Sequence, residues 1–194
     1  MADGGFRPAD NLQFCTATDS QVIVGVGVET TGSDAGQLVP MVEQVKERYE
    51  IVPAEVLVDG GFAQHDQIEA ASAPGLGCTV YAPVPKPKGP QVDRHAPKPS
   101  DSAAVAAWRE RMGTGEAKLI SKERAATAEC VHALARGRGL IHLLVRGLAK
   151  VKAPDPGNVG GFRRILPVRE PLFLGRDSAR LRFGIPCSSP AVGR

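Results

Sequence analysis

The sequence lacks the features that would indicate a secreted or zinc-binding protein. Its 194 residues include only four cysteines, at positions 15, 78, 130 and 187. No two of them form a CxxC pair, and none stands at zinc-finger spacing from a histidine, which argues against a structural zinc site. The first residues, Met1 to Phe6, contain neither the basic segment nor the apolar segment of a secretory signal. We therefore expect a cytoplasmic protein with reduced thiols.

Long apolar runs and a strong charge of either sign are also missing. The longest apolar stretch, around Leu140 to Val145, is far too short to span a bilayer, so no membrane partner is expected. The net charge of +3 and the pI near 8.8 permit binding to nucleic acid without requiring it. The 42% apolar content and 23% charged content are typical of a globular domain.

The first 84 residues predict an α/β layer with mixed strand pairing. The segment from Asn11 to Glu29 predicts a hairpin with its turn at Thr18–Ser20, since β-branched and apolar residues flank turn-forming ones. A helix is expected from about Ala35 to Tyr49, with Ser33 as its N-cap and Asp34 in its first turn. Its apolar stripe is Leu38, Met41, Val42 and Val45. Further elements are expected as a buried strand at Val56–Val58, a helix at His65–Ala71 and a strand at Cys78–Val84.

The middle of the chain predicts an insertion, over about residues 83–118, that begins with a loop. Residues 83–100 are rich in proline and lysine, which is typical of an extended, mobile segment. Helical composition follows from Ser102 to Leu144, and Gly113-Thr114-Gly115 interrupts it. We expect the folded domain to cover residues 1–152.

The composition changes abruptly in residues 153–194, which contain no lysine but many Arg, Pro, Gly and Ser residues. No helical or strand period persists there, so we expect a disordered tail from about Pro154 onward. Such a shift is what a GC-rich gene gives when it is read out of frame, and we interpret the tail as an out-of-frame product. Better continuations in the other reading frames of the gene would support this hypothesis.

The most informative local motif is Val56-Leu57-Val58-Asp59-Gly60-Gly61-Phe62. A carboxylate at the C-terminal end of a buried strand lies where α/β sheets place their active sites. The two glycines would let the backbone approach a substrate closely. The simpler interpretation is a strand-ending turn, since Asp-Gly is a common turn pair, and the motif alone favours it.

A second motif places an acidic residue among basic ones on the later helix. Glu129 and Arg136 are seven residues apart and share a helical face, and Arg124 lies nearby in the sequence. A glutamate in such a setting can hold a metal while its neighbours hold phosphate. By itself the pattern fits a solvated, charged helix better.

Taken together, these stretches resemble the DDE transposases of bacterial insertion sequences over about three quarters of the chain, from Gly4 to about Lys152. The resembling stretches are Gly5–Ala9, Asn11–Gln13, Gln21–Val26, Gly32–Asp34, Leu57–Phe62, Val80–Pro83 and Lys122–Glu129. The resemblance implies a partial ribonuclease-H-like α/β fold, with a mixed sheet and flanking helices, that lacks its first strand.

The resemblance assigns Asp59 to the second carboxylate of the triad and Glu129 to the third, both as ligands of Mg²⁺ or Mn²⁺. It assigns Arg124 and Arg136 to DNA binding beside that glutamate, with Lys86 and Lys88 of the loop, joined by Arg94 and Lys98, as further phosphate contacts. The sequence departs from the family at several positions. Ser121 stands where the family usually has tyrosine, Asp10 where an aromatic residue is expected, and Gly27 where a carboxylate is common.

The first catalytic aspartate belongs on a strand before the hairpin, and no residue here matches it. In the family, the carboxylates hold two metal ions that carry out phosphoryl transfer on DNA. We therefore expect a transposase fragment that binds DNA, including transposon ends, without cutting it, and we leave a homo-oligomer open.

Two other classes of function stay open at this stage. One is a non-catalytic DNA-binding protein derived from a transposase, which would show salt-dependent binding without cleavage. The other is a small α/β enzyme with a dinucleotide cofactor. Gly25-Val26-Gly27 does not complete a GxGxxG motif and lies inside an expected strand, which makes this class the least favoured.

Overall fold

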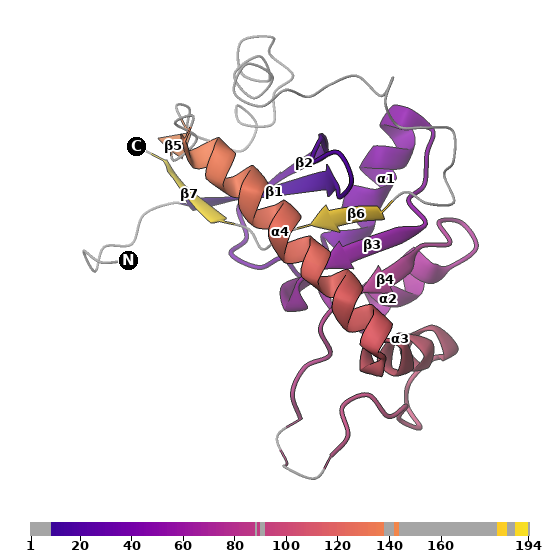
Figure 1. Cartoon of the computed structure of the whole chain (residues 1–194). Coiled ribbons are helices and arrows are strands. Elements are labelled where there is room, and N and C mark those ends of the chain that lie inside the picture. The colour runs from indigo at the N-terminus through magenta and orange to yellow at the C-terminus, as the bar shows by residue number, and fades with distance from the viewer. Residues whose placement is uncertain are drawn as a thin grey trace.

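The protein is an α/β domain built on one mixed sheet. The computed structural model describes residues 9–87, 89, 92–137, 142–143, 182–185 and 189–193. In these residues seven strands pair in the order β4-β3-β6-β1-β7-β5, and β2 adds to β1. Helix α4 crosses one face of the sheet, while α1 and α2 lie against the opposite face (Figure 1).

The predicted hairpin is confirmed. Strand β1 (Ala9–Ala17) pairs antiparallel with β2 (Ile23–Glu29), and the turn lies between them. Within β1 the alternation of side chains sends Leu12 and Phe14 to one face, and Asn11 and Gln13 to the other. The face carrying Asn11 and Gln13 is the one that meets α1 and the loop before it.

Helix α1 (Leu38–Tyr49) packs closely on β2 because two glycines leave room for it. A Cβ on Gly25 would lie 2.8 Å from Met41 Sδ, and one on Gly27 would lie 3.1 Å from Met41 Cε. The Gln44 side chain hydrogen-bonds both backbone groups of Val26, accepting at 2.9 Å and donating at 3.0 Å. The side of β2 away from β1 has no partner strand in the described residues. Gln44 satisfies the Val26 N–H and carbonyl on that side. The predicted apolar stripe of α1 is buried as expected.

The predicted start of α1 is wrong. The helix begins at Leu38, and its N-cap position is Gln37, which makes no side-chain capping bond. Instead, Gln67 on α2 accepts a hydrogen bond from the Val39 N–H at 3.1 Å. Ser33 Oγ accepts from the Ala35 N–H, within its own turn. A contact from another helix has replaced the local cap that the sequence pattern favours.

The central strands follow the expected order. Strand β3 (Glu55–Val58) leads into a short 3₁₀ turn, η1 (Gly60–Phe62), and then into α2 (His65–Ser72). Strand β4 (Thr79–Tyr81) pairs parallel with β3 and is shorter than predicted. Because helices cover both faces of the sheet at β3, its side chains Val56, Leu57 and Val58 are all buried (Figure 1).

The end of the chain differs from the expected unpacked tail. Strand β6 (Arg182–Ile185) lies between β1 and β3, antiparallel to the first and parallel to the second. Strand β7 (Ser189–Gly193) pairs with the first half of β1 and with β5 (His142–Leu143). The place between β1 and β3, where the resemblance implies a missing strand, is therefore occupied by β6. Residues 153–181, which make up most of the predicted tail, lie outside the described residues.

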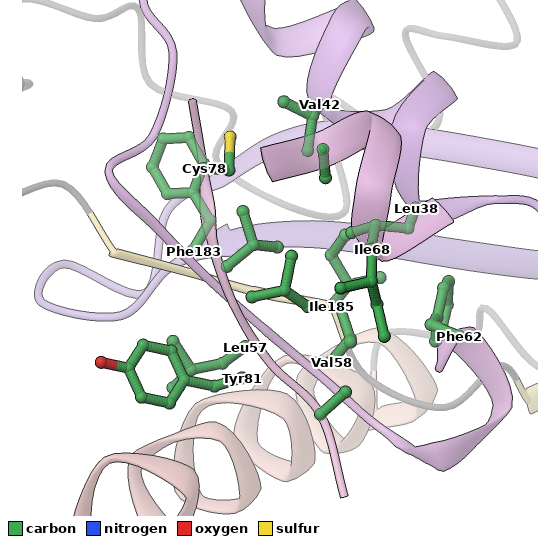
Figure 2. Close-up of a cluster of buried hydrophobic side chains, with 14 of the residues drawn as sticks. Leu38, Val42, Leu57, Val58, Phe62, Ile68, Cys78, Tyr81, Phe183 and Ile185 are labelled. Atoms are coloured by element: carbon green, nitrogen blue, oxygen red, sulfur yellow. The ribbon is translucent and has the colours of Figure 1, made fainter. Parts of the chain in front are cut away.

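The main core lies between the sheet and the two helices α1 and α2. Figure 2 shows its side chains from α1, α2, β3 and β6 gathered into one cluster. Phe62, Ile68, Phe183 and Ile185 are completely buried in this cluster. Alternation along β6 explains why this strand is accepted in the sheet. Phe183 and Ile185 point into the cluster, while Gly184 faces α4 near Arg124.

Helices α3 (Ala103–Gly113) and α4 (Gly115–Gly137) follow one another with the predicted break at Thr114. Ser102 caps α3 by accepting from the Val105 N–H. Trp108 is fully buried, and its indole N–H donates to the Ala82 carbonyl at 3.1 Å, which fixes α3 beside β4. No helix in the described part of the chain is long and apolar enough to cross a membrane.

The second half of the proline- and lysine-rich loop contacts α3. Arg109 Nε donates to Asp101 Oδ2 at 2.6 Å, and Arg109 Nη1 donates to the Arg94 carbonyl at 3.2 Å. The two charged side chains are only 6% and 2% exposed. Burial acts to raise the pKa of Asp101, but hydrogen bonds from Lys98 and Arg109 outweigh it and hold that pKa below its usual 3.8. The ion pair therefore stabilises the fold above pH 3.8, and this contribution is lost as the pH falls through the lowered pKa.

We expect Arg109→Met to release the loop. The substitution removes both hydrogen bonds, so the bond after Arg94 should be cut by trypsin roughly tenfold faster than in the unaltered protein. Mass spectrometry of a limited digest measures the rate. Glu110→Met, at the exposed neighbouring position, is the control and should leave it unchanged. Equal rates for the two variants would show that Arg109 does not hold the loop.

The two buried cysteines belong to the core. Burial raises the pKa of Cys78 to about 11, and burial with the nearby Cys78 raises that of Cys15 further. Cys15, Cys78 and Cys130 are free thiols. Both buried sulfurs therefore stay protonated near neutral pH and behave as small apolar groups.

Candidate functional site

Asp59 lies where the sequence predicts it, directly after β3 at the C-terminal end of that strand. It is the N-cap of η1, and its Oδ1 accepts a hydrogen bond from the Gly61 N–H at 2.8 Å. Phe62, the last residue of the motif, is completely buried and so fixes the turn against the core. The carboxylate is consequently half-buried on a rigid turn at one end of the sheet.

A second carboxylate, Asp34, meets Asp59 at Gly61. Asp34 Oδ2 and Asp59 Oδ1 each lie 3.2 Å from the point that a Cβ on Gly61 would occupy. The two oxygens are therefore no more than twice that distance apart. Gly61 is needed for this approach, whereas a Cβ on the neighbouring Gly60 would meet nothing within 4 Å.

Two amide side chains hold Asp34 from the other side. Asn11 Nδ2 and Gln13 Nε2, two residues apart on β1, each donate to Asp34 Oδ1 at 2.9 Å. Asp34 is only 7% exposed, and Asn11 and Gln13 are 5% and 1% exposed. Buried carboxylates require such donors, because an unpaired charge away from water is costly.

Sequence reasoning missed Asp34 as a site residue. It placed Asp34 in the first turn of α1, but the residue lies before that helix and contacts β1 and the η1 turn. One available signal was the alternation of Asn11 and Gln13 with Leu12 and Phe14. Two large amides on one face of a hairpin strand indicate either solvent or a polar partner, and the structure supplies the partner.

Glu129 lies on α4, and its side chain is outside the described residues. The adjacent Cys130 donates from Sγ to Gln21 Oε1 at 3.4 Å, in the turn of the hairpin. That turn follows the C-terminal end of β1. Asp59 lies near the opposite end, since β3 is parallel to β6 and β6 is antiparallel to β1. The shared site of Asp59 and Glu129 therefore stays a prediction, and the described carboxylate beside Asp59 is Asp34.

The predicted DNA-binding residues are spread over the loop and α4. Lys86 is exposed in the loop after β4, as is Lys98, and Arg94 is half-buried there. Arg124 is half-buried on α4, where its Cγ would lie 3.9 Å from a Cβ on Gly184. Lys88 and the side chain of Arg136 are outside the described residues. The loop, α4 and the Asp59 turn do not converge on one described cluster.

The donor set at Asp34 and Asp59 suits a hard divalent cation. It offers two carboxylates, and Mg²⁺ and Mn²⁺ prefer oxygen ligands. The amides of Asn11 and Gln13 lie on the other side of Asp34, and Gln13 Oε1 is 3.4 Å from the Cβ position of Gly27. The described residues contain no group of three or more His, Cys, Asp and Glu residues placed to hold a metal. A cation at Asp59 would therefore have Asp34 as the nearest further carboxylate and would depend on water for its remaining ligands.

The glycines of Gly25-Val26-Gly27 have a packing role. They lie within β2 and face Met41 of α1. A dinucleotide site needs such glycines at a turn between a strand and a helix, where backbone N–H groups can reach a phosphate. The motif therefore gives no support to a cofactor-binding enzyme.

Comparison of the chain with models of protein families, with curated proteins and with solved structures finds no match.

Proposed function

We propose that the chain is a fragment of an insertion-sequence DDE transposase that binds DNA without cutting it. In the family that it resembles, carboxylates and divalent cations carry out phosphoryl transfer on DNA. The observation that carries the proposal is the position of Asp59, on a rigid turn at the C-terminal end of a central strand. It is the residue that the resemblance assigns to the second carboxylate.

The arrangement of the elements supports a ribonuclease-H-like fold as part of this proposal. An antiparallel hairpin is followed by parallel strands β3 and β4, with helices on both faces of the sheet (Figure 1). Helix α4, which carries Glu129, packs across the sheet. The strand that fills the place between the hairpin and β3 is β6, whose residues Arg182–Ile185 include no acid.

Binding of the DNA backbone would come from the basic side chains of the loop. Lys86 and Lys98 are exposed, and the Arg109–Asp101 pair holds their loop to α3. A loop that is already ordered loses less conformational entropy when it binds. Phosphate contacts of this kind give affinity that is largely independent of base sequence and falls with salt.

We expect the double variant Lys86→Gln/Lys98→Gln to weaken DNA binding. Each phosphate contact that is lost should reduce the slope of log affinity against log salt by about 0.9 for duplex DNA. Fluorescence anisotropy with a labelled duplex between low and moderate salt, with EDTA present, measures both affinity and slope.

The control for this variant is Lys46→Gln/Arg48→Gln, which removes the same charge from α1, far from the loop (Figure 1). It should leave the slope unchanged, because the loop contacts are intact. Equal losses in the two double variants would mean that only net charge matters. No measurable binding by the unaltered protein at low salt would overturn the proposed function.

A further inference from the structure

Arg182, the first residue of β6, is bonded to the chain on both sides of its strand and to α4. Its Nη1 donates to Glu123 Oε2 on α4 at 2.7 Å, and its Nε donates to Glu55 Oε2 at the start of β3. Its carbonyl oxygen accepts from the Thr18 N–H at 3.0 Å and from Thr18 Oγ1 at 3.1 Å, just after β1. The end of β6 is therefore fixed by contacts from three separate segments.

The charges around Arg182 are complementary. Its side chain, 26% exposed, lies between the carboxylates of Glu55 and Glu123. Burial acts to lower the pKa of Arg182, but hydrogen bonds with Glu123 and Glu55 outweigh it and raise that pKa. Glu55 Oε1 also accepts from Tyr81 Oη at 3.1 Å. Without a cation at position 182, the half-buried carboxylate of Glu55 would lose its charged partner.

The sequence of β6 leaves a second register open. The chain reads Arg180-Leu181-Arg182-Phe183-Gly184-Ile185, in which basic or small residues alternate with apolar ones. A shift of one residue would turn the apolar side chains out of the core, but a shift of two keeps them inside. Leu181 and Phe183 would then take the places of Phe183 and Ile185. A shift in the other direction would bring Pro186 into the strand, where it cannot donate a hydrogen bond to the ladder.

The shifted register would place Arg182 where Gly184 lies, against α4. A Cβ on Gly184 would lie 3.9 Å from Arg124 Cγ and 3.8 Å from Thr18 Cγ2. A small side chain fits there, but a long one would meet α4. Two arginines would also approach one another, and like charges repel. The observed register avoids this contact and gives Arg182 its two carboxylates.

We propose that Arg182 fixes the register of β6 and so selects which residues of the tail occupy the place between β1 and β3. It acts in two ways. Its ion pairs with Glu55 and Glu123 favour the observed register, and its size and charge disfavour the shifted one. Specifying register is the best-attested use of ionic and polar groups within a fold. This inference does not depend on the proposed function, because it involves neither DNA nor a metal ion.

Nuclear magnetic resonance of the full chain tests the proposal. Ala17 and Phe183 face one another across β1 and β6, so a nuclear Overhauser effect between their backbone protons reports the observed register. In Arg182→Gly the obstacle against α4 is gone, and Arg180 can replace the lost charge only after a shift of two residues. We expect the contact of Ala17 to change from Phe183 to Leu181. Arg182→Lys, which keeps the charge, should retain the Ala17–Phe183 contact.

Hydrogen exchange of the Phe183–Ile185 amides decides the question if Arg182→Gly does not fold. Arg182→Met should speed this exchange by roughly tenfold or more, whereas Arg182→Lys should change it by less than about threefold. Arg48→Met, at an exposed position of α1, is the control and should leave the rates unchanged. A folded Arg182→Gly variant that keeps the Ala17–Phe183 contact would overturn the proposal. Equal exchange rates in Arg182→Met and Arg182→Lys would also overturn it.

Discussion

Replacing Phe183 with aspartate should unfold most of the protein under native conditions. Phe183 is completely buried between the sheet and its helices, and it lies on a strand that pairs with both β1 and β3. The variant loses the apolar burial and gains an unpaired buried charge. A loss of more than about 4 kcal/mol is expected from these two effects. Domains are stable by only about 5–15 kcal/mol, so such a loss removes most of the margin.

Urea denaturation followed by circular dichroism measures this effect. Leu119→Asp is the control, because Leu119 is 64% exposed on α4 and its replacement should change the stability by less than about 0.5 kcal/mol. A Phe183→Asp variant with the denaturation midpoint of the unaltered protein would mean that residues 182–185 do not pair in the sheet. The out-of-frame interpretation of the tail would then gain support.

The second prediction is that the 194-residue chain produces no detectable strand cleavage or joining. Two-metal phosphoryl transfer needs ions held on both sides of the reacting phosphate, and the resemblance assigns only two of the three carboxylates in this chain, Asp59 and Glu129. Strand β6, beside the strand that leads to Asp59, contributes no carboxylate. Because catalytic groups of this kind act as a unit, the loss should be close to total, up to about 10⁶-fold by analogy with other catalytic triads.

A supercoiled plasmid incubated with the protein and Mg²⁺ or Mn²⁺ reveals nicking on an agarose gel. The control for contaminating nuclease is the Asp59→Ala variant, purified in the same way. Metal-dependent nicking by the unaltered chain that disappears in this variant would show that the site is complete after all. DNA binding without nicking also fits a non-catalytic DNA-binding protein derived from a transposase.

The elements that sequence reasoning predicted correctly are those with a strong local pattern. The hairpin follows from β-branched runs around a turn, and α1 from its apolar stripe at helical spacing. Strand β6 was missed because its partners are more than 120 residues away and its surroundings are rich in arginine and proline. A short strand gains most of its stability from such distant partners, which no local window contains.

The candidate site was predicted only in part, because some of its contacts also come from residues that are distant in the sequence. Asp59 was found because a strand-ending Asp-Gly-Gly is visible locally. The position of Asp34 depends on Asn11, Gln13 and Gly61, which reach it from other segments. The local rule that favours an acid at a helix start assigned it a different role. Side-chain positions at a meeting point of three segments follow from the tertiary fold.

The two glycines of β2 have a consequence for the seating of α1. Helix α1 rests on β2 through Met41 at Gly25 and Gly27. A methyl group on Gly25 would lie 2.8 Å from Met41 Sδ and 3.0 Å from Cys15 Cβ, so the Met41 side chain would have to shift. The fit of one helix on a strand thus depends on side chains that two positions of the strand do not carry.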